Sequence, residues 1–272
     1  MNAGEHGSDW QELTLPGAVT TLVAGGYRLW LQVPPNAGDA ALPVLWLLDG
    51  ASLFPSVARA VAILSRRADA TGVAPMVVVG IDHAPPDTAR RDAEYSFGPC
   101  RDPAGLSRPP EQGGGPAMLR RIQSLFRQTV ESRMHIDGER QALLGHSLGG
   151  HFALNALALH PDCIRVAGAI SPSIWWDAPA MQNALSAMPD AGQSLFLAAG
   201  EREEPASIQQ PADERRIARG IVREARKAAE IARQKLGEDR VKLAIAPDED
   251  HASAFLTVLP AFLRFASTAL TR

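Results

Sequence analysis

The stretch "ALLGHSLGGHFALNAL", residues 142–157, places one serine among glycines, between an apolar run and a helix-like one. Gly145, Ser147 and Gly149 match the G-x-S-x-G pattern of a nucleophile elbow, in which a serine stands on a sharp turn between a strand and a helix. Small residues are needed there because the backbone is strained and the helix packs close to the sheet. The pattern predicts that Ser147 is a nucleophile. The alternative is a structural serine in a tight corner.

Short apolar runs alternate with longer segments of helical period on both sides of this stretch. We predict strands at residues 27–33, 43–50, 74–82, 140–146, 165–171, 193–200 and 240–247. We predict helices at residues 54–68, 116–132, 148–160, 178–187, 211–236 and 252–270. This alternation favours an α/β fold with a mostly parallel central sheet and helices on both of its faces.

The length and composition suit one domain with a substantial core, since 46% of the 272 residues are hydrophobic. We predict an N-terminal tail at 1–14 and a single domain at 15–272. A Pro/Gly-rich insertion at 83–115 interrupts the alternation, and long loops of this kind tend to be functional or disordered. We interpret the charged residues of 211–236 as a solvated helix surface.

The charge and cysteine content exclude several classes of function. A formal net charge of -3 provides no field for binding nucleic acid or an anionic membrane, so small molecules or proteins are the expected partners. Cys100 and Cys163 are too few for a disulfide scaffold, and no cluster has metal-site spacing, so no metal or cofactor is predicted. The chain shows neither a signal-peptide pattern nor a membrane span. We expect a cytoplasmic protein, or a periplasmic one if a native leader has been removed.

A serine nucleophile needs a base and, in most cases, a carboxylate that orients the base. In the α/β-hydrolase arrangement the acid and then the histidine follow the serine along the chain. His251 comes directly after the last predicted strand and is the candidate base; the alternative is a histidine that merely starts a helix. Glu201, Glu203 and Glu204 follow the strand at 193–200 and stay open as the acid, as does a Ser-His dyad.

Acyl transfer also needs N–H donors that face the developing oxyanion. One is predicted to be the backbone N–H of Leu148, the residue after the nucleophile. The loop after the strand at 43–50 provides the other, and it nominates Gly50 or Ala51.

Several segments together resemble one family. They are "GHSLGGHFALNALALHPDCIRVAGAISPSIWWD", "LLDG", "RRDAEYSF", "AAGEREEP" and "DEDHASAF". The chain resembles the esterase-D-like α/β hydrolases over roughly residues 15–268, and within them the siderophore esterases that open enterobactin and salmochelin trilactones. The resemblance implies an α/β-hydrolase fold and a serine carboxylesterase without a cofactor, which hydrolyses ester or lactone bonds of a catecholate siderophore through an acyl-enzyme.

Two other functions stay open. One is a generic carboxylesterase or an S-formylglutathione-hydrolase-like thioesterase. The other is a non-catalytic binding protein on the same scaffold, because a fold does not determine a function.

The resemblance also implies roles for single residues. It assigns Ser147 and His251 to the catalytic pair. It favours Glu203 as the acid, because relatives tend to carry the acid three residues past the glycine that ends the strand, here Gly200. It places Ala51 ahead of Gly50 as the second oxyanion donor.

Substrate contacts follow from the same resemblance. An arginine in the segment "ARRDAEY" is expected to meet the anionic catecholate, which nominates Arg90 and Arg91, and a planar guanidinium suits catechol oxygens and aromatic faces. Trp175 is expected to stack on aryl groups of the substrate, while Trp176 fits the core equally well. The predicted partner is a small-molecule ester, with a ferric catecholate siderophore as the specific candidate.

Overall fold

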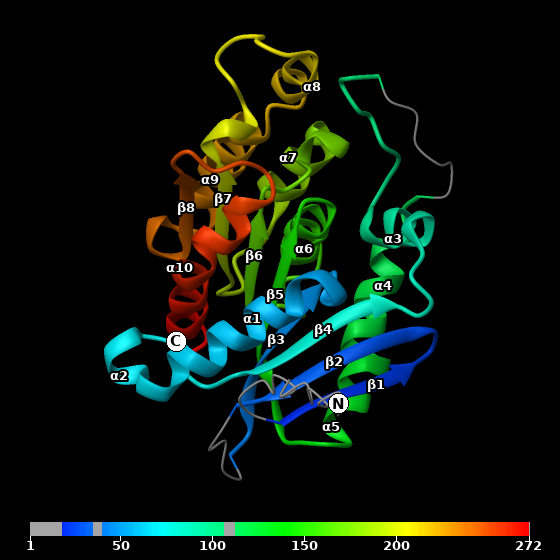
Figure 1. Ribbon diagram of the computed structural model, residues 1–272, viewed down its shortest axis with the longest axis vertical. Helices are drawn as coiled ribbons and strands as arrows, with labels where there is room; N and C mark the ends of the chain where they lie inside the picture. The colour runs from blue at the N-terminus through cyan, green and yellow to red at the C-terminus, as the bar shows by residue number, and fades with distance from the viewer. Residues whose placement is uncertain (1–17, 35–39, 106–111, 272) are drawn as a thin grey trace, which may run out of the picture.

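The computed structural model describes residues 18–34, 40–105 and 112–271 (Figure 1). The predicted N-terminal tail at 1–14 lies outside these residues. The centre of the described chain is one eight-stranded sheet, with the strand order β1-β2-β4-β3-β5-β6-β7-β8. The strands are β1 (Ala18–Ala24), β2 (Tyr27–Val33), β3 (Leu42–Leu48), β4 (Val77–His83), β5 (Ile136–His146), β6 (Val166–Ile170), β7 (Ser194–Gly200) and β8 (Val241–Ala246).

All seven predicted strands are present. Across the sheet, β4, β3, β5, β6, β7 and β8 pair in parallel in this order. β1 is not among the predicted strands, and it pairs antiparallel with β2 at one edge of the sheet. Gly25 and Gly26 connect the two strands with φ of 57° and 81°. Two successive residues of positive φ are what a tight hairpin turn requires, and glycine adopts them without a steric penalty.

Helices cover both faces of the sheet (Figure 1). They are α1 (Gly50–Leu64), α2 (Ala68–Thr71), α3 (Thr88–Tyr95), α4 (Gly115–Arg121), α5 (Arg127–Glu131), α6 (Leu148–Leu159), α7 (Ala178–Ala187), α8 (Pro211–Arg219), α9 (Ile221–Leu236) and α10 (Ser253–Ala269). Alternate side chains of β3 enter two separate cores: Trp46 and Leu48 pack with α4, α6, α7 and α9, whereas Leu45 and Leu47 pack with α1 and α10. The predicted α/β class is therefore confirmed.

Two segments differ from the sequence prediction. The helix predicted at 211–236 is two helices, because Gly220 adopts a left-handed conformation with φ of 54° and ends α8. The insertion at 83–115 contains the helix α3, which begins where the Asp87 side chain accepts a hydrogen bond from the Arg90 N–H at 2.9 Å. The separate helix α8 and the helix α3 thus place charged residues near the carboxyl ends of β7 and β4.

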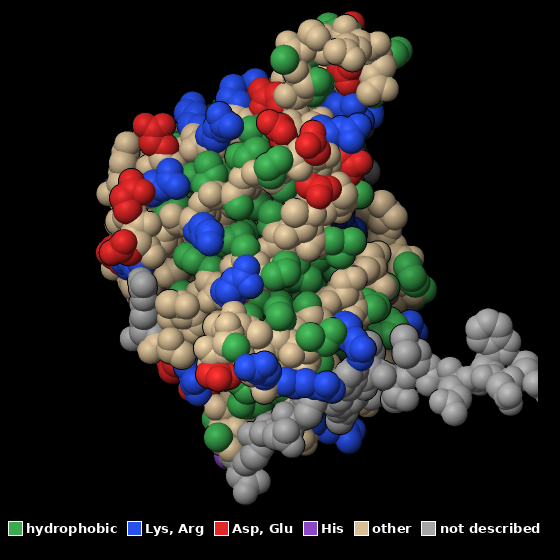
Figure 2. Space-filling model, turned by 60° about the vertical axis from the view of Figure 1, so that its left-hand side comes forward, with side chains coloured by type: hydrophobic (Ala, Val, Ile, Leu, Met, Phe, Trp, Pro, Cys, Tyr) green, Lys and Arg blue, Asp and Glu red, His purple; other side chains and the backbone are tan. Residues whose placement is uncertain are grey.

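The surface around α10 combines apolar and charged areas. Figure 2 shows hydrophobic side chains across the middle of this face, with charged side chains gathered near the upper end, below the projecting α8 segment. Among the residues the structure describes, no helix has the length and apolarity that a membrane crossing demands.

Candidate active site

The turn between β5 and α6 raises Ser147 at the carboxyl end of the sheet. Ser147 has φ of 57° and ψ of −118°, a strained conformation for any residue except glycine. A Cβ at Gly145 would lie 2.0 Å from the carbonyl oxygen of Gly149, so only glycine fits there. The Ser147 N–H donates to the carbonyl of Ile170 at 3.0 Å, which ties this turn to β6.

The turn after β8 brings His251 to the same place. His251 and Ser147 line one pocket of about 360 Å³. His251 Nδ1 lies 2.6 Å from Glu203 Oε2. When Nδ1 carries the proton and donates to this carboxylate, Nε2 keeps the lone pair that a general base needs.

Glu203 is buried, with 3% of its surface exposed, in a 3₁₀ turn directly after β7. Its Oε1 accepts hydrogen bonds from Ser171 Oγ and from the Gly200 N–H, each at 2.6 Å. Burial by itself would raise the pKa of Glu203, but the hydrogen bonds from His251, Ser171 and Gly200 outweigh it and hold the pKa below its ordinary value. The carboxylate is therefore ionised at neutral pH.

The other two candidate acids point elsewhere. Glu204 accepts hydrogen bonds from the backbone and the guanidinium of Arg223, and Glu201 accepts one from the N–H of Asp248. Of the three glutamates that the sequence leaves open, the structure thus brings Glu203 to His251.

His146 contacts both the backbone and the ring of His251, and the sequence did not predict this role. His146 Nε2 lies 2.7 Å from the carbonyl oxygen of His251, and the two rings are 4.6 Å apart. Burial, together with the charge of His251, lowers the pKa of His146 to about 4. A neutral His146 can donate its Nε2–H to the carbonyl without placing a second positive charge beside the base.

The predicted oxyanion donors lie in different surroundings. Leu148 is the first residue of α6, so its N–H belongs to the first turn, where helical N–H groups have no partner within the helix. The N–H of Ala51 instead donates to the carboxylate of Asp82, at the end of β4. An N–H that already donates to a carboxylate is less available to an oxyanion, so the choice between Ala51 and Gly50 as the second donor stays open.

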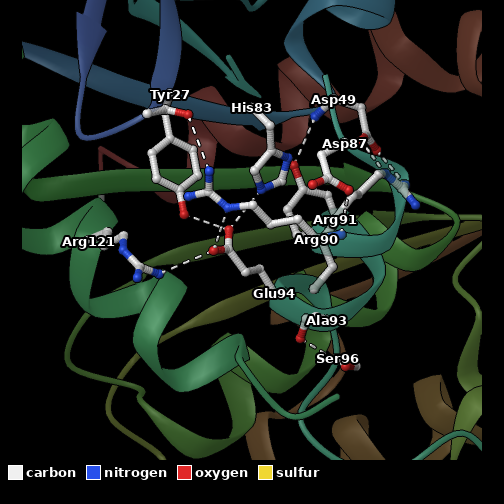
Figure 3. Close-up of polar contacts among 12 residues, drawn as sticks. Tyr27, Asp49, His83, Asp87, Arg90, Arg91, Ala93, Glu94, Ser96 and Arg121 are labelled. Atoms are coloured by element: carbon white, nitrogen blue, oxygen red, sulfur yellow. Dashed lines mark hydrogen bonds and ion pairs between the residues drawn. The ribbon is translucent and has the colours of Figure 1, made fainter. Parts of the chain in front are cut away.

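Arg91 and Arg90 lie beside this loop on α3, and both form ion pairs within the protein (Figure 3). Arg91 donates to both carboxylate oxygens of Asp49, at 2.5 and 2.8 Å, and its guanidinium lies 5.0 Å from the ring centre of Tyr95. Arg90 donates to Glu94 at 3.1 Å and lies over the ring of Tyr27. These ion pairs use some of the five N–H donors of each guanidinium and fix both arginines on α3. Their role as catecholate ligands stays a prediction.

Glu94 is the centre of the polar cluster in Figure 3. It accepts hydrogen bonds from Tyr27 at 2.5 Å and Arg90 at 3.1 Å, and lies 2.8 Å from His83 Nε2. Burial alone would raise the pKa of Glu94, but these contacts lower it to about 2. The ionised cluster joins α3 to β2 and β4, so it fixes the helix from which Arg91 reaches Asp49.

We expect the Arg91→Ala variant to lose stability and turnover rather than substrate affinity. Asp49 precedes the oxyanion loop, and the ion pair is partly exposed, at 27% for Arg91 and 18% for Asp49. Loss of the pair should reduce the free energy of unfolding by about 1–3 kcal/mol, between the values typical of surface and buried pairs. Urea unfolding and steady-state kinetics measure both effects, with Arg120→Ala on exposed α4 surface as the control. A raised KM at unchanged stability would instead support the predicted role of Arg91 as a substrate ligand.

Arginines from α8 and its neighbourhood line the pocket that holds Ser147. Four of them lie there, together with Trp175; they are Arg202, Arg215, Arg216 and Arg219. The charge pattern of 211–236 predicts a solvated helix surface, whereas the structure places three arginines of α8 at the pocket. Gly220 was the available signal, since a glycine in a helical pattern can end the helix and turn its charged residues toward a different neighbour.

Trp175 and Arg219 form one wall of this pocket. The Arg219 guanidinium lies 3.7 Å from the ring centre of Trp175 and donates to the carboxylate of Asp102, which comes from the 83–115 insertion. Trp175 is 7% exposed and borders the pocket, whereas Trp176 is 1% exposed and donates from Nε1 to the carbonyl of Gly98. Trp176 is thus a core residue. Trp175 lines the pocket, and its stacking on aryl groups of the substrate stays a prediction. Within the described part of the chain, no group of His, Cys, Asp and Glu side chains is arranged to hold a metal ion.

Comparisons with known proteins identify the family of the chain. The model of the Esterase family matches residues 24–254. The ferri-bacillibactin esterase BesA of Bacillus subtilis is 32% identical over 218 residues, covering 73% of this chain and 75% of that protein. The siderophore enterobactin esterase of Emericella nidulans is 31% identical over 187 residues, covering 60% of this chain and 61% of that protein. The crystal structure of the BES protein from Bacillus cereus has a TM-score of 0.79 at 26% identity, covering 95% of this chain and 98% of that one.

The family match spans most of the chain, and it includes β2 to β8 and the first residues of α10. It confirms the resemblance found in the sequence, and the structural similarity confirms the α/β-hydrolase fold. The protein is an ester-hydrolysing enzyme, and the chain belongs to the Esterase family.

Proposed function

We propose that this protein is a serine carboxylesterase that opens ester or lactone bonds of a catecholate siderophore through an acyl-enzyme. One observation carries the proposal: the pocket that contains Ser147 and His251 also contains four arginines and Trp175. A nucleophile with its base supplies the chemistry. Arginines beside an aromatic ring suit a substrate that is both aromatic and anionic.

The relatives support the same class of substrate. The matched protein of Bacillus subtilis is named a ferri-bacillibactin esterase, and that of Emericella nidulans a siderophore enterobactin esterase. The partner we propose for this chain is accordingly a siderophore ester, iron-loaded or iron-free.

In the proposed mechanism, Ser147 Oγ attacks the ester carbonyl while His251 Nε2 accepts its proton. His251 then protonates the leaving alkoxide, and the acyl group stays on Ser147. A water molecule repeats the sequence on the acyl-enzyme and releases the acid. Glu203 holds His251 in the required tautomer and stabilises the imidazolium that forms in each step.

The negative charge that develops on the carbonyl oxygen needs donors. We propose the N–H of Leu148 for one of them, since it follows the nucleophile and lies at the positive end of α6. The second is the N–H of Gly50 or that of Ala51, which also donates to Asp82.

A product assay tests the proposal. Purified protein is incubated with a cyclic catecholate trilactone, and the linear products are followed by chromatography and mass spectrometry beside a simple aryl ester and a glutathione thioester. We expect ring opening at a higher kcat/KM than hydrolysis of either small substrate. An intact trilactone with rapid thioester cleavage would favour the thioesterase. Failure of every ester and of a fluorophosphonate probe would favour a binding protein.

The arginines provide a sharper prediction about substrate charge. Arg202 and Arg215 both line the pocket, where their guanidinium groups can meet an anionic substrate. We expect the Arg202→Ala/Arg215→Ala double variant to raise KM for the catecholate substrate about tenfold, since each contact with an anion at an exposed site is worth up to roughly 1 kcal/mol. The KM for neutral p-nitrophenyl butyrate should stay unchanged.

Arg226→Ala is the matched control for the double variant, because it removes a positive charge from α9 outside the pocket. It should leave both KM values as they are. The predicted difference should shrink as salt is added, because ions screen exposed charges. Equal effects on the charged and neutral substrates would contradict recognition of an anion by these arginines.

A further inference from the structure

The turn after β6 reads Ser171-Pro172-Ser173, and its backbone is tied to the nucleophile elbow. The Ser173 N–H donates to the carbonyl of Ser147 at 2.9 Å, and the Ser147 N–H donates to the carbonyl of Ile170 at 3.0 Å. Ser173 is 2% exposed, and it lines the pocket that also contains Ser147. The position of Ser173 relative to the nucleophile is therefore set by hydrogen bonds on both sides of the turn.

The side chains of these two serines also meet. Ser173 Oγ lies 3.3 Å from Ser147 Oγ, and in the resting enzyme either hydroxyl can be the donor. Catalysis removes this ambiguity. Once the proton of Ser147 has passed to His251, the oxygen of Ser147 can only accept, so Ser173 becomes the donor.

We propose that Ser173 is a further catalytic residue: its hydroxyl donates to Ser147 Oγ and stabilises the negative charge on that oxygen. The inference rests on the proposed serine-esterase function. The charge develops twice, first as Oγ attacks the ester carbonyl and again as the same oxygen leaves when water cleaves the acyl-enzyme. The hydroxyl contributes in both steps, and no proton moves to or from Ser173.

Ser171, in the same turn, acts at the opposite end of the catalytic group. Its hydroxyl donates to Oε1 of Glu203 at 2.6 Å, and it is fully buried with φ of 47°. A non-glycine residue at this φ is strained, and strain of this kind persists only where surrounding contacts hold it. Here the Ser171 N–H donates to the carbonyl of Ala198 at 2.7 Å. Ser171 is a positioning residue that works through the acid, so it provides an internal comparison for Ser173.

The two roles predict different measurements. Loss of the Ser173 hydroxyl should slow every reaction of Ser147 Oγ and leave the pH dependence alone, because Glu203 and His251 are untouched. Loss of the Ser171 hydroxyl should raise the pKa of Glu203 and so alter the acidic limb of the pH profile. A Ser173 that only lines the pocket would change KM and leave kcat as it is.

The experiment uses the full chain with Ser173→Ala, Ser173→Thr, Ser173→Cys and Ser171→Ala. We measure kcat and KM for p-nitrophenyl butyrate, the rate of labelling by a fluorophosphonate probe, and the pH profile of kcat/KM. For Ser173→Ala we expect kcat and the labelling rate to fall together by roughly 10- to 100-fold, as for loss of a hydrogen bond to a charged oxygen. KM and the shape of the pH profile should stay unchanged.

The other substitutions separate the hydroxyl from the space it fills. Ser173→Thr keeps the donor and should recover most of the rate. Ser173→Cys fills the space of the side chain with only a weak donor, so it should be nearly as slow as Ser173→Ala and replaces it if the alanine variant melts early. A labelling rate within twofold of the wild type in the Ala and Cys variants would overturn the inference.

The same assay distinguishes this inference from the proposed function. A wild-type protein that the probe labels at Ser147, with Ser173 variants that are labelled equally fast, contradicts the role of Ser173 alone. A wild-type protein that neither reacts with the probe nor hydrolyses the ester contradicts the proposed serine chemistry, and the role of Ser173 with it.

Discussion

The Ser147→Ala variant is expected to lose hydrolysis of p-nitrophenyl butyrate almost completely, with kcat reduced roughly 10⁴- to 10⁶-fold. The reason is that Ser147 forms the covalent intermediate in the proposed mechanism, so its loss removes the acylation step itself. The residual rate would come from the oxyanion donors and from binding. Steady-state kinetics on purified protein measure the loss, and mass spectrometry should show no fluorophosphonate adduct.

Alanine retains the strained backbone of Ser147, so the fold of this variant should be unchanged and its stability close to that of the wild type. A second variant, Ser147→Gly, is the matched control. Glycine accepts φ of 57° with ψ of −118° without strain, so this variant should be equally inactive but more stable by about 1 kcal/mol. Circular dichroism and thermal melts check both expectations. An undiminished rate in Ser147→Ala would contradict the assignment of the nucleophile.

The Glu203→Gln variant is expected to reduce kcat/KM roughly 10²- to 10⁴-fold with little change in the fold. The amide oxygen of glutamine can still accept from Ser171 and Gly200, which now bond to Oε1. The amide nitrogen then faces His251 Nδ1, which must become an acceptor. His251 would carry its proton on Nε2, where it cannot act as a base toward Ser147. A pH-rate profile beside the wild type measures the change.

Glu201→Gln and Glu204→Gln are the matched controls, because each removes one carboxylate from the same turn. Both should keep activity near that of the wild type, since the structure places their side chains against Asp248 and Arg223 rather than His251. A large loss in either variant, with Glu203→Gln active, would move the acid to that position.

Glu203 also links stability to pH. Its pKa is lowered in the folded state, so its contribution to the free energy of unfolding is fully present above the ordinary glutamate value of about 4.3. The contribution is lost as the pH falls through the lowered value. The difference in stability between wild type and Glu203→Gln should therefore shrink under acid conditions, which denaturant titrations at several pH values measure.

Much of the fold was predictable because its elements are locally encoded. Continuous apolar runs such as the strand at 43–50 identify buried strands, and the period of 148–160 identifies the elbow helix. β1 was missed because its sequence, AVTTLVA, neither alternates strictly between apolar and polar residues nor forms a continuous apolar run. Helix α3 was missed because its composition is almost wholly polar, and the cap at Asp87 was its one clear sign.

The chemistry of Ser147 could be proposed from the sequence because a strained elbow demands glycines at set spacings, and His251 followed from chain order. Sequence reasoning could not assign Arg91 and the arginines of α8 to their surroundings. The sequence around an arginine does not show whether its side chain will face a buried carboxylate or an open pocket. Asp49 is the partner of Arg91, and Asp102 is the partner of Arg219. Each aspartate lies far from its arginine along the chain.

The sequence by itself determined the α/β class, the family and the elbow that carries Ser147, because each depends on residues close together in the chain. The tertiary structure brings Glu203, which the resemblance favours, to His251. Only that structure decided which arginines enter the pocket and that Ser171 and Ser173 reach the acid and the nucleophile. The reason is physical: the carboxyl ends of parallel strands bring residues from distant segments to one edge of the sheet, and the contacts there depend on side-chain direction, which no local pattern records.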